Sequence, residues 1–381
     1  MKFCLSLVLL LMCAATFAQN STTKTDSTLI ELYQTQKFGE AADLLKKTYP
    51  EPLNNKVLAQ LAYASNQAGR LPDAEAYYQR LYSIDSTNLS VLFSMASIQM
   101  RRGNNAKSLA YYKRILKIDS TNFSVYRQLA TLSKNTGDIV ANLVYLQKAN
   151  KINPENGDVA YDLSTAMIGF KQFEQAEKII DVALHADTSN ILLLTGKMQV
   201  DFNLKKYPEM IDICTRLINN QAQSTQVINY KGIAEFRLKK YKECIKTLHM
   251  LDSTDTQTET SYYYLGLSHK ALKDNAKAIY YLQKAINEGI SPATNSYYSE
   301  IGDCYDQMHL PKKAIAAYQR GLTFGEKPMA LYAMAAIYDV SLKDTLMAVR
   351  YYKKYISSKP PADSQQSFIE YTSHRINELH R

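Results

Sequence analysis

The chain has 381 residues, 46% of them hydrophobic, and a formal net charge of +9. Length alone would predict two or three globular domains, and the positive charge is compatible with binding to nucleic acid or to an anionic surface. The basic residues, however, are spread along the chain as short pairs such as Arg101-Arg102 and Lys239-Lys240. This distribution favours a solvated basic face, and we therefore expect no nucleic-acid partner.

The first 18 residues have the three parts of a secretory signal peptide. Lys2 is basic, an apolar run extends from Leu5 to Met12, and residues 16–18 read Thr-Phe-Ala. This pattern predicts residues 1–18 as a signal peptide and an exported protein, periplasmic or envelope-associated and of bacterial type. The apolar run is shorter than the roughly 20 residues that a membrane-spanning helix needs. A lipid anchor at Cys13 stays open as an alternative, although Met12 is bulky for that signal.

Residues 19–28 (QNSTTKTDST) are polar and lack an apolar period, so we expect a flexible tether there. Beyond it, one fifteen-residue phrase occurs twice. Residues 74–88 read AEAYYQRLYSIDSTN and residues 108–122 read SLAYYKRILKIDSTN, with nine identities at an offset of 34. A weaker copy follows another 34 residues later, at 142–156. A fixed period of 20 to 50 residues predicts a stack of supersecondary units.

Each unit contains two predicted helices. Apolar residues three and four apart precede each phrase, as in residues 57–64, and indicate one helix face. Gly69, Gly103 and Gly137 then interrupt the pattern, where a tight turn favours a residue without Cβ. The Asp-Ser-Thr-Asn run ends the second helix and offers N-cap side chains to the next one. The unit is therefore helix–turn–helix–turn, and copies must stack to bury their apolar faces.

The Asp-Ser-Thr triplets allow a second interpretation. They begin at Asp26, Asp85, Asp119 and Asp252, and a related Asp-Thr-Leu begins at Asp344. They resemble the acid–hydroxyl–apolar triplet at which some bacterial envelope proteins are O-glycosylated. Helix capping is the favoured explanation.

The unit resembles the tetratricopeptide repeat family. The resemblance is carried by two columns of small residues at which paired helices cross closely. In the first helix these are Ala62, Ala96, Ala130, Ser164, Gly232, Gly266 and Gly302. In the second helix they are Ala41, Ala74, Ser108, Ala176, Ala278, Ala314 and Ala348. Asn142 and Met198 depart from the two columns.

The resemblance implies an all-α fold, a right-handed superhelical α-solenoid of about ten helix–turn–helix repeats over residues 29–358. Pro360-Pro361 would end the array, because proline cannot continue a helix. Residues 359–381 are then expected to hold a capping helix that covers the last repeat. Its apolar face would be Phe368, Tyr371, Ile376 and Leu379.

No motif for catalysis, for a cofactor or for a metal stands out, so we expect a non-enzyme with no cofactor. Asp303 and Asp306 share a helix face, which a solvated surface explains better than catalysis. After signal cleavage Cys214, Cys244 and Cys304 remain, an odd number that does not suggest a disulfide framework. We expect buried thiols, with a bridge between Cys214 and Cys244 left open.

In the family that the chain resembles, the first helices line an inner groove that binds the partner. Steps of 34 give one inward column at Phe93, Arg127, Tyr161, Thr195, Asn229 and Tyr263. A second column, one turn later, holds Met100, Lys134, Ile168, Phe202, Phe236 and Lys270. The predicted partner-binding residues are Tyr63, Phe93, Arg127, Lys134, Tyr161, Phe202, Tyr230 and Tyr263. The alternative for each of them is packing between repeats.

The expected function is a non-catalytic scaffold or adaptor that binds protein or peptide partners in the cell envelope. The lysine–asparagine clamp by which some family members hold a C-terminal carboxylate is absent, since Arg127 stands with Thr131 and Asn229 with Ile233. A carbohydrate- or solute-binding envelope protein is the alternative. The chain has no tryptophan for sugar stacking but has 29 tyrosines. Peripheral or lipid-tethered membrane association and the oligomeric state stay open.

Overall fold

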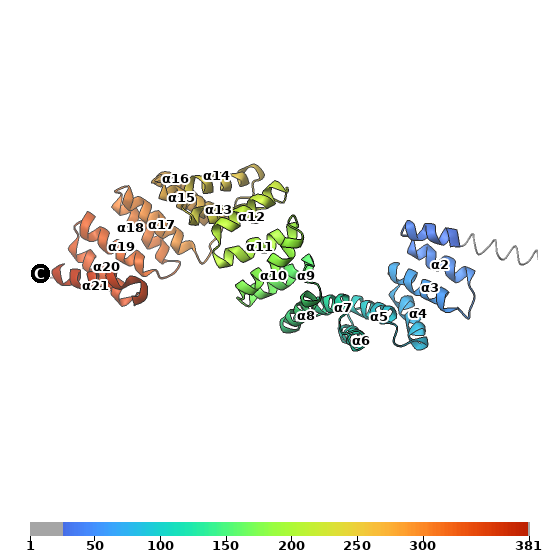
Figure 1. Cartoon of the computed structure of the whole chain (residues 1–381). Coiled ribbons are helices and arrows are strands. Elements are labelled where there is room, and N and C mark those ends of the chain that lie inside the picture. Colours follow the sequence, from blue (N-terminus) through green and yellow to red (C-terminus); the bar gives the residue numbers. More distant parts are fainter. Residues whose placement is uncertain (1–25, 380–381) are drawn as a thin grey trace, which may run out of the picture. The chain divides into compact units, whose positions relative to one another are not determined.

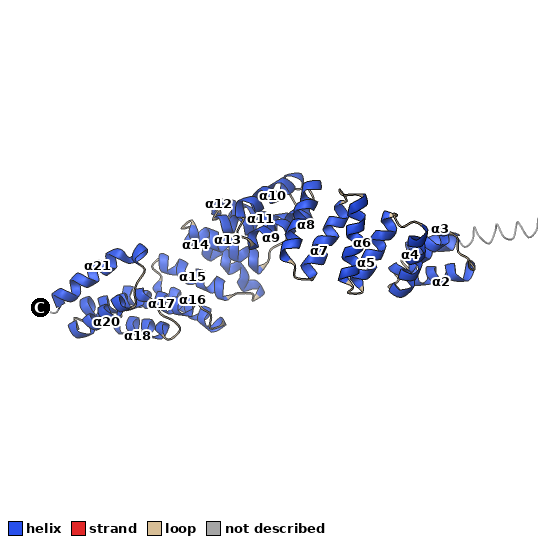
Figure 2. Cartoon of the chain, turned by 90° about the horizontal axis from the view of Figure 1, so that it is seen from below, coloured by secondary structure: helices blue, strands red, loops and turns tan. Residues whose placement is uncertain are grey.

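The computed structural model describes residues 26–379, and these residues form helices but no strand (Figure 2). The predicted signal peptide and residues 19–25 of the predicted tether lie outside the described part. The chain divides into two compact units, residues 1–167 and 168–381, here called the N-terminal and the C-terminal unit. None of the helices between residues 26 and 379 has the length and hydropathy of a membrane span.

The helices of the N-terminal unit begin with one over residues 26–34. Residues 26–28 were expected in the tether and are helical instead, so the first helix starts earlier than Leu29. It is followed by α2 (Phe38–Thr48), α3 (Asn55–Gln67), α4 (Leu71–Ile84), α5 (Leu89–Arg101), α6 (Asn105–Ile118), α7 (Phe123–Asn135), α8 (Ile139–Ile152) and α9 (Gly157–Gly169), which contains the boundary between the units (Figure 1).

The C-terminal unit continues the same alternation. Its helices are α10 (Phe173–Ala186), α11 (Ile191–Leu204), α12 (Tyr207–Asn219), α13 (Thr225–Arg237), α14 (Tyr241–Leu248), α15 (Glu259–Ala271), α16 (Asn275–Glu288), α17 (Thr294–Gln307), α18 (Pro311–Leu322), α19 (Pro328–Ala336), α20 (Thr345–Ser357) and α21 (Ala362–Leu379). A 3₁₀ helix, η1 (His249–Thr254), extends α14, and a π-helix, η2 (Ile337–Ser341), extends α19.

First and second helices alternate along the whole described chain. The helix over residues 26–34 and the odd-numbered helices α3 to α19 are the first helices, here called A helices, and the even-numbered helices α2 to α20 are the B helices. The described residues thus hold ten A and ten B helices followed by α21, which confirms the predicted α-solenoid of about ten repeats.

The turn between the A and B helix contains a residue with a positive φ in all ten repeats. These residues are Gln36, Gly69, Gly103, Gly137, Lys171, Lys205, Lys239, Lys273, His309 and Lys343. The three glycines confirm the predicted turns. The other seven carry side chains in a conformation that costs a non-glycine residue about 1–2 kcal/mol, so glycine alone was an incomplete signal for the turn.

The predicted N-caps are formed. The side chains of Asn54, Asn88, Asn122 and Asn156 each accept a hydrogen bond from the backbone N–H three residues later, at 3.0–3.1 Å. In the loop before, Asp85 accepts hydrogen bonds from the backbone and the hydroxyl of Thr87. The asparagine bonds satisfy donors that a helix start leaves unpaired, and the Asp85 bonds lie within the connector. The Asp-Ser-Thr run therefore has a structural role as a connector.

The small residues of the two columns lie where A and B helices cross closely. Ala62, Ala96, Ala41 and Ala74 are fully buried. A Cβ added at Gly302 would lie 2.6 Å from the ring of Tyr318. The exceptions are accommodated too: Met198 is fully buried, and the Nδ2 of Asn142 donates to the backbone oxygen of Ala130 at 2.8 Å.

The last helix covers the end of the array, as predicted. Helix α21 contacts α20 (Figures 1 and 2). Ile376 and Leu379 pack against the core of the last repeats, and the ring of Phe368 lies 4.9 Å from that of Tyr332. Tyr371 stays about half exposed.

The three cysteines of the described part are free thiols, all of them fully buried. The disulfide that was left open between Cys214 and Cys244 is not formed. Burial raises the pKa of both thiols to about 12 and that of Cys304 to about 11. Because the thiolate is the reactive form, these cysteines act as small apolar core residues.

Candidate binding surfaces on the A helices

In the N-terminal unit Tyr63 has the accessibility that a partner-binding residue needs. It is 45% exposed, and its ring meets the rings of Tyr33 and Phe38 edge-on, at 6.0 Å in both cases. Tyr63 also lines a hollow of about 520 Å³ together with Ile84, itself 57% exposed. Exposed aromatic and aliphatic groups beside an open hollow are typical of a protein-binding surface.

Phe93 was predicted for the groove and is mainly a packing residue. It is half-buried, and its ring contacts that of the fully buried Tyr112 edge-on at 5.6 Å. It belongs to the apolar cluster that joins α5, α6 and α7. For this residue, packing within the array describes the structure better.

Arg127 and Lys134 share a cavity between α7 and α9. The cavity has a volume of about 250 Å³, and Asn142 and Leu146 of α8 complete its lining. Arg127 Nη2 lies 3.1 Å from Asp158 Oδ2, and Lys134 Nζ lies 3.8 Å from Asp162 Oδ1. Both cations are exposed, so these surface pairs contribute little stability and remain open to exchange with a partner's charges.

Tyr161, the remaining predicted residue of this unit, is half-buried on α9. The N-terminal unit therefore presents Tyr63 on α3 and Arg127 and Lys134 on α7 as exposed side chains, and Tyr161 is less accessible.

In the C-terminal unit Phe202 and Tyr230 form one aromatic pair. Their rings lie 4.8 Å apart and join α11 to α13. Tyr230 lines an open cavity of about 460 Å³ with Thr225, Gln226, Asn229, Ile233 and Thr260. These two predicted residues thus lie together at a hollow.

Tyr263 is the predicted residue most involved in packing. Its ring lies 5.4 Å from Tyr264 and 4.9 Å from Tyr297, and burial raises its pKa to about 12. Its ring contact with Tyr297 joins α15 to α17, whereas Phe202 and Tyr230 are half-buried.

Asp303 and Asp306 on α17 were expected on a solvated surface, and only one of them is exposed. Asp303 is half-buried rather than solvated. Its carboxylate lies 2.6 Å from Lys270 Nζ and accepts a hydrogen bond from the Tyr318 hydroxyl, while Glu300 lies 2.7 Å from the same lysine. Lys270, an inward-column residue, is thereby neutralised within the array. Asp306 is exposed, as predicted.

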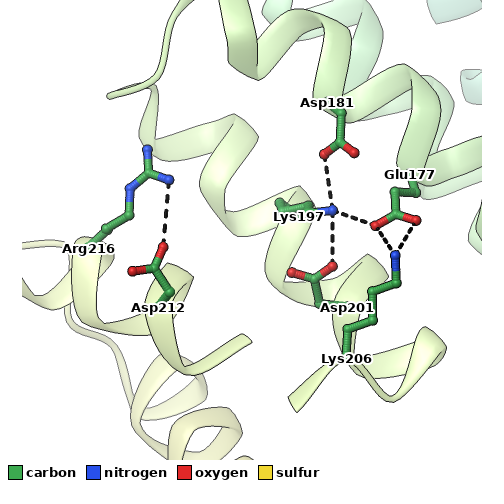
Figure 3. A network of polar contacts seen from close by, with 7 residues as sticks. All are labelled: Glu177, Asp181, Lys197, Asp201, Lys206, Asp212 and Arg216. Atoms are coloured by element: carbon green, nitrogen blue, oxygen red, sulfur yellow. Dashed lines mark hydrogen bonds and ion pairs between the residues drawn. The ribbon is translucent and has the colours of Figure 1, made fainter. Parts of the chain in front are cut away.

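A larger charged cluster, missed at the sequence level, lies between α10 and α11 (Figure 3). Lys197 Nζ lies 2.7 Å from Glu177 Oε1, 3.0 Å from Asp181 Oδ1 and 3.1 Å from Asp201 Oδ1 (Figure 3). Lys206 lies 2.7 Å from the second oxygen of Glu177. We call these five residues the Lys197 cluster.

Burial shapes the ionisation of the Lys197 cluster. The Asp201 side chain is fully buried, and desolvation raises its pKa to about 6. Burial also disfavours charge on Glu177, but hydrogen bonds from Lys197 and Lys206 outweigh that effect and lower its pKa. The carboxylates in turn raise the pKa of Lys197 despite its own burial.

A sequence signal for this cluster existed. At steps of 34 from Lys197 stand the buried Leu129, Leu163 and Leu265 and the half-buried Lys231. A lysine in a column of buried leucines must find carboxylates, but the sequence does not say from which helix they come. Among residues 26–379 no group of three metal-ligating side chains is placed to hold a metal ion.

Protein-family models identify the repeat. Models of the tetratricopeptide repeat match residues 30–88, 89–122, 136–196 and 260–288. No curated protein matched the sequence.

Several solved structures are similar to the chain. A tetratricopeptide repeat protein from Parabacteroides merdae shares 18% identity over 65% of this chain and 98% of that one, with a TM-score of 0.43. PilW, described as a type IV pilus biogenesis factor, shares 16% identity over 56% of this chain and 98% of its own, with a TM-score of 0.47. A structure of the APC/C hetero-tetramer Cut9-Hcn1 shares 12% identity over 93% of this chain and 82% of that one, with a TM-score of 0.47.

The matched stretches cover repeats in both units, and the same helix pair recurs between and beyond them. The chain is therefore an α-solenoid of tetratricopeptide repeats.

Proposed function

We propose that the chain is a non-catalytic scaffold or adaptor that binds protein or peptide partners on its A-helix faces. The observation that carries the proposal is the pairing of accessible anchors with open hollows. Tyr63, Arg127 and Lys134 in one unit, and Tyr230 in the other, are A-helix residues that line cavities. Tyr161 is half-buried on α9, and Phe202 contacts the ring of Tyr230. A few aromatic and arginine anchors carry most of the energy of a typical protein interface.

Location in the cell envelope is part of the proposal. It rests on the signal-peptide pattern of residues 1–18, with cleavage after Ala18. Mass spectrometry of the chain purified from its native cells tests this step directly: a mature N-terminus at Gln19 supports export, and a retained Met1 contradicts it.

A triple variant tests partner binding. Tyr63→Ala, Arg127→Ala and Tyr161→Ala together remove two exposed anchors and one half-buried anchor, and leave Phe93, a packing residue, in place. We expect unchanged helicity and capture of native partners weakened at least about tenfold. The matched control replaces exposed B-helix residues, Lys107→Ala, Gln147→Ala and Lys151→Ala.

The comparison of the two variants decides the proposal. Quantitative mass spectrometry of captured proteins should show loss with the A-helix variant only. Equal capture by both variants contradicts binding on the A-helix face of this unit. Carbohydrate or solute binding remains the second candidate, because Tyr230 lines a neutral, hydroxyl-bearing cavity.

A further inference from the structure

The B helices α6 and α8 of the N-terminal unit are neighbours. They share a hollow of about 400 Å³, which is lined by Leu109 and Lys113 of α6 and by Ala141 and Tyr145 of α8, together with the end of α7. We call the exposed side of these two helices the α6–α8 face, and the residues that characterise it are Lys107, Lys113, Lys117, Val140, Val144 and Lys151.

The α6–α8 face is basic. Helix α6 carries four cations and α8 two, and neither helix contains an aspartate or a glutamate. Asp119 and Asp138, which flank the helices, accept hydrogen bonds from Thr121 and from the backbone N–H of Ala141. Four of the lysines are exposed and have no hydrogen bond or ion pair with another described residue, namely Lys107, Lys113, Lys117 and Lys151. Their charge is therefore available to an anionic partner.

Helix α8 adds exposed apolar side chains to this charge. Val140 and Val144 are 66% and 41% exposed and lie one turn apart, and Ile139 beside them is 62% exposed. Within the described chain α8 exposes four large apolar side chains, whereas no other B helix exposes more than one. Lys148 and Lys151 follow one and two turns after Val144, so apolar and basic groups share one side of the helix.

A solvated basic surface does not account for this combination. Helices α18 and α20 also carry six cations and no acid, but they expose one large apolar side chain, Leu346. The valines of α8 are also not directed at the cavity that holds Arg127. Asn142 lines that cavity, and Val144 lies roughly 200° further around the helix. The α6–α8 face is therefore a separate surface with its own apolar centre.

We infer that the α6–α8 face binds the surface of an anionic lipid bilayer. Val140 and Val144 enter the boundary of the acyl chains, and the lysines extend their ammonium groups to the lipid phosphates, as amphipathic interfacial helices do. The negative surface potential of such a bilayer attracts the unpaired lysines. A soluble polyanion would satisfy this charge but would leave the valines in water. The inference goes beyond the proposed function, since it assigns B helices and a lipid surface.

Vesicle sedimentation tests the inference on the chain beginning at Gln19, which lacks the predicted signal peptide. The probes are vesicles of phosphatidylcholine alone and vesicles in which about 30% of the lipid is phosphatidylglycerol. We expect binding to the anionic vesicles only, and weaker binding as salt rises from about 100 to about 500 mM, because salt screens the charges. No binding to anionic vesicles, or equal binding to neutral ones, overturns the inference.

Two variants separate the roles of charge and apolar surface. Lys113→Glu with Lys117→Glu reverses charge on α6, and Val140→Gln with Val144→Gln removes the apolar centre while keeping good helix formers. Each should weaken binding to anionic vesicles at least about tenfold, with helicity retained in circular dichroism. The matched control, Lys312→Glu with Lys353→Glu, makes the same charge change at exposed positions of α18 and α20 and should bind nearly as the original chain does.

The pattern across these variants decides between a lipid and other polyanions. Unchanged binding by the valine variant overturns the lipid assignment, because any polyanion would then suffice. Equal weakening by the control and by the Lys113 and Lys117 variant overturns the assignment to this face. The variants that test partner capture on the A helices retain Val140 and Val144, so the proposed function can fail or stand independently of this result.

A fluorescent label reports insertion directly. Val144→Cys carries an environment-sensitive dye, and Leu346→Cys is the control on α20; Cys214, Cys244 and Cys304 are buried and stay unlabelled. We expect a blue shift of the dye at position 144 on anionic vesicles and none at position 346. A dye at position 144 that stays in a water-like environment overturns the inference.

Discussion

Arg375 of the capping helix forms a two-point ion pair with Asp339 of the π-helix η2. Arg375 Nε lies 2.8 Å from Asp339 Oδ2 and Nη2 lies 2.9 Å from Oδ1. The Asp339 side chain is only 4% exposed, and the hydrogen bonds from Arg375 lower its pKa below the usual value. The pair therefore joins α21 to the last repeat by a polar contact in addition to the apolar one.

Removing this pair should loosen the cap. We expect Asp339→Ala to cost about 2 kcal/mol, since hydrogen bonds to charged groups contribute about 1.5–3 kcal/mol. Hydrogen exchange should accelerate in α21 first and leave α3 to α7 protected. Because the pKa of Asp339 is lowered in the fold, its contribution is present above the unfolded pKa and is lost as pH falls through the folded value. Equal protection of α21 in both proteins would contradict the role of the pair.

The close helix crossing in the ninth repeat can be tested by a glycine-to-alanine substitution, which adds one methyl group. Gly302→Ala places a Cβ 2.6 Å from the Tyr318 ring, and that ring is buried and held by Asp303. We expect a loss of about 1–3 kcal/mol from overpacking, measured by thermal unfolding. Gly169→Ala is the control, because nothing lies within 4 Å of its Cβ and the change should be close to neutral. Equal melting temperatures of the two variants would contradict the placement of Gly302 at a close helix crossing.

The turn position should tolerate a side chain at a small cost. A Cβ at Gly103 meets nothing within 4 Å, although φ is +77° there. Gly103→Lys reproduces the natural state of Lys239, which holds the same turn with φ of 61°. We expect a loss of about 1–2 kcal/mol from the left-handed conformation with the fold intact. Circular dichroism would show retained helix, and a collapse of helicity would mean that this turn requires glycine.

From the Lys197 cluster we predict a variant whose stability depends on pH more strongly than that of the original chain. Lys197→Met removes the cation that faces Glu177, Asp181 and Asp201, and leaves the fully buried Asp201 uncompensated. Breaking a buried pair in this way costs about 3–5 kcal/mol. Lys206 still neutralises Glu177, so the loss should be centred on Asp201.

The sign of the pH dependence follows from Asp201. Its pKa is already raised in the original fold, to about 6, and without Lys197 it should rise further. A group with a raised folded pKa stabilises the fold below its unfolded pKa and loses that contribution as pH rises through the folded value. Urea unfolding should therefore show the variant losing more stability than the original chain between about pH 5 and pH 8. The control, Lys197→Met with Asp201→Asn, should remove most of that slope, and a slope equal to that of the single variant would point to another group.

Much of the fold could be predicted from the sequence, because its information is local and periodic. The 34-residue phase places Ala62, Ala96 and Gly302 at helix crossings, and the Asn of each connector at an N-cap. A small residue at a crossing and an asparagine before a helix each determine the structure close to their own position. Because both recur every 34 residues, they can be recognised from the sequence. The seven turns without glycine were less visible, since a lysine can adopt the left-handed conformation once two packed helices impose it.

The candidate binding surface was only partly predictable. One column of the phase contains Phe93, Arg127 and Tyr263, yet Phe93 and Tyr263 pack against Tyr112 and Tyr297 while Arg127 stays exposed. The sequence determined which side of each A helix these residues occupy. Only the tertiary structure decided which of them remain accessible, because the exposure of a side chain depends on the size of its neighbours on the adjacent repeat. The same holds for Lys197, whose three carboxylates come from two helices and meet only when those helices pack.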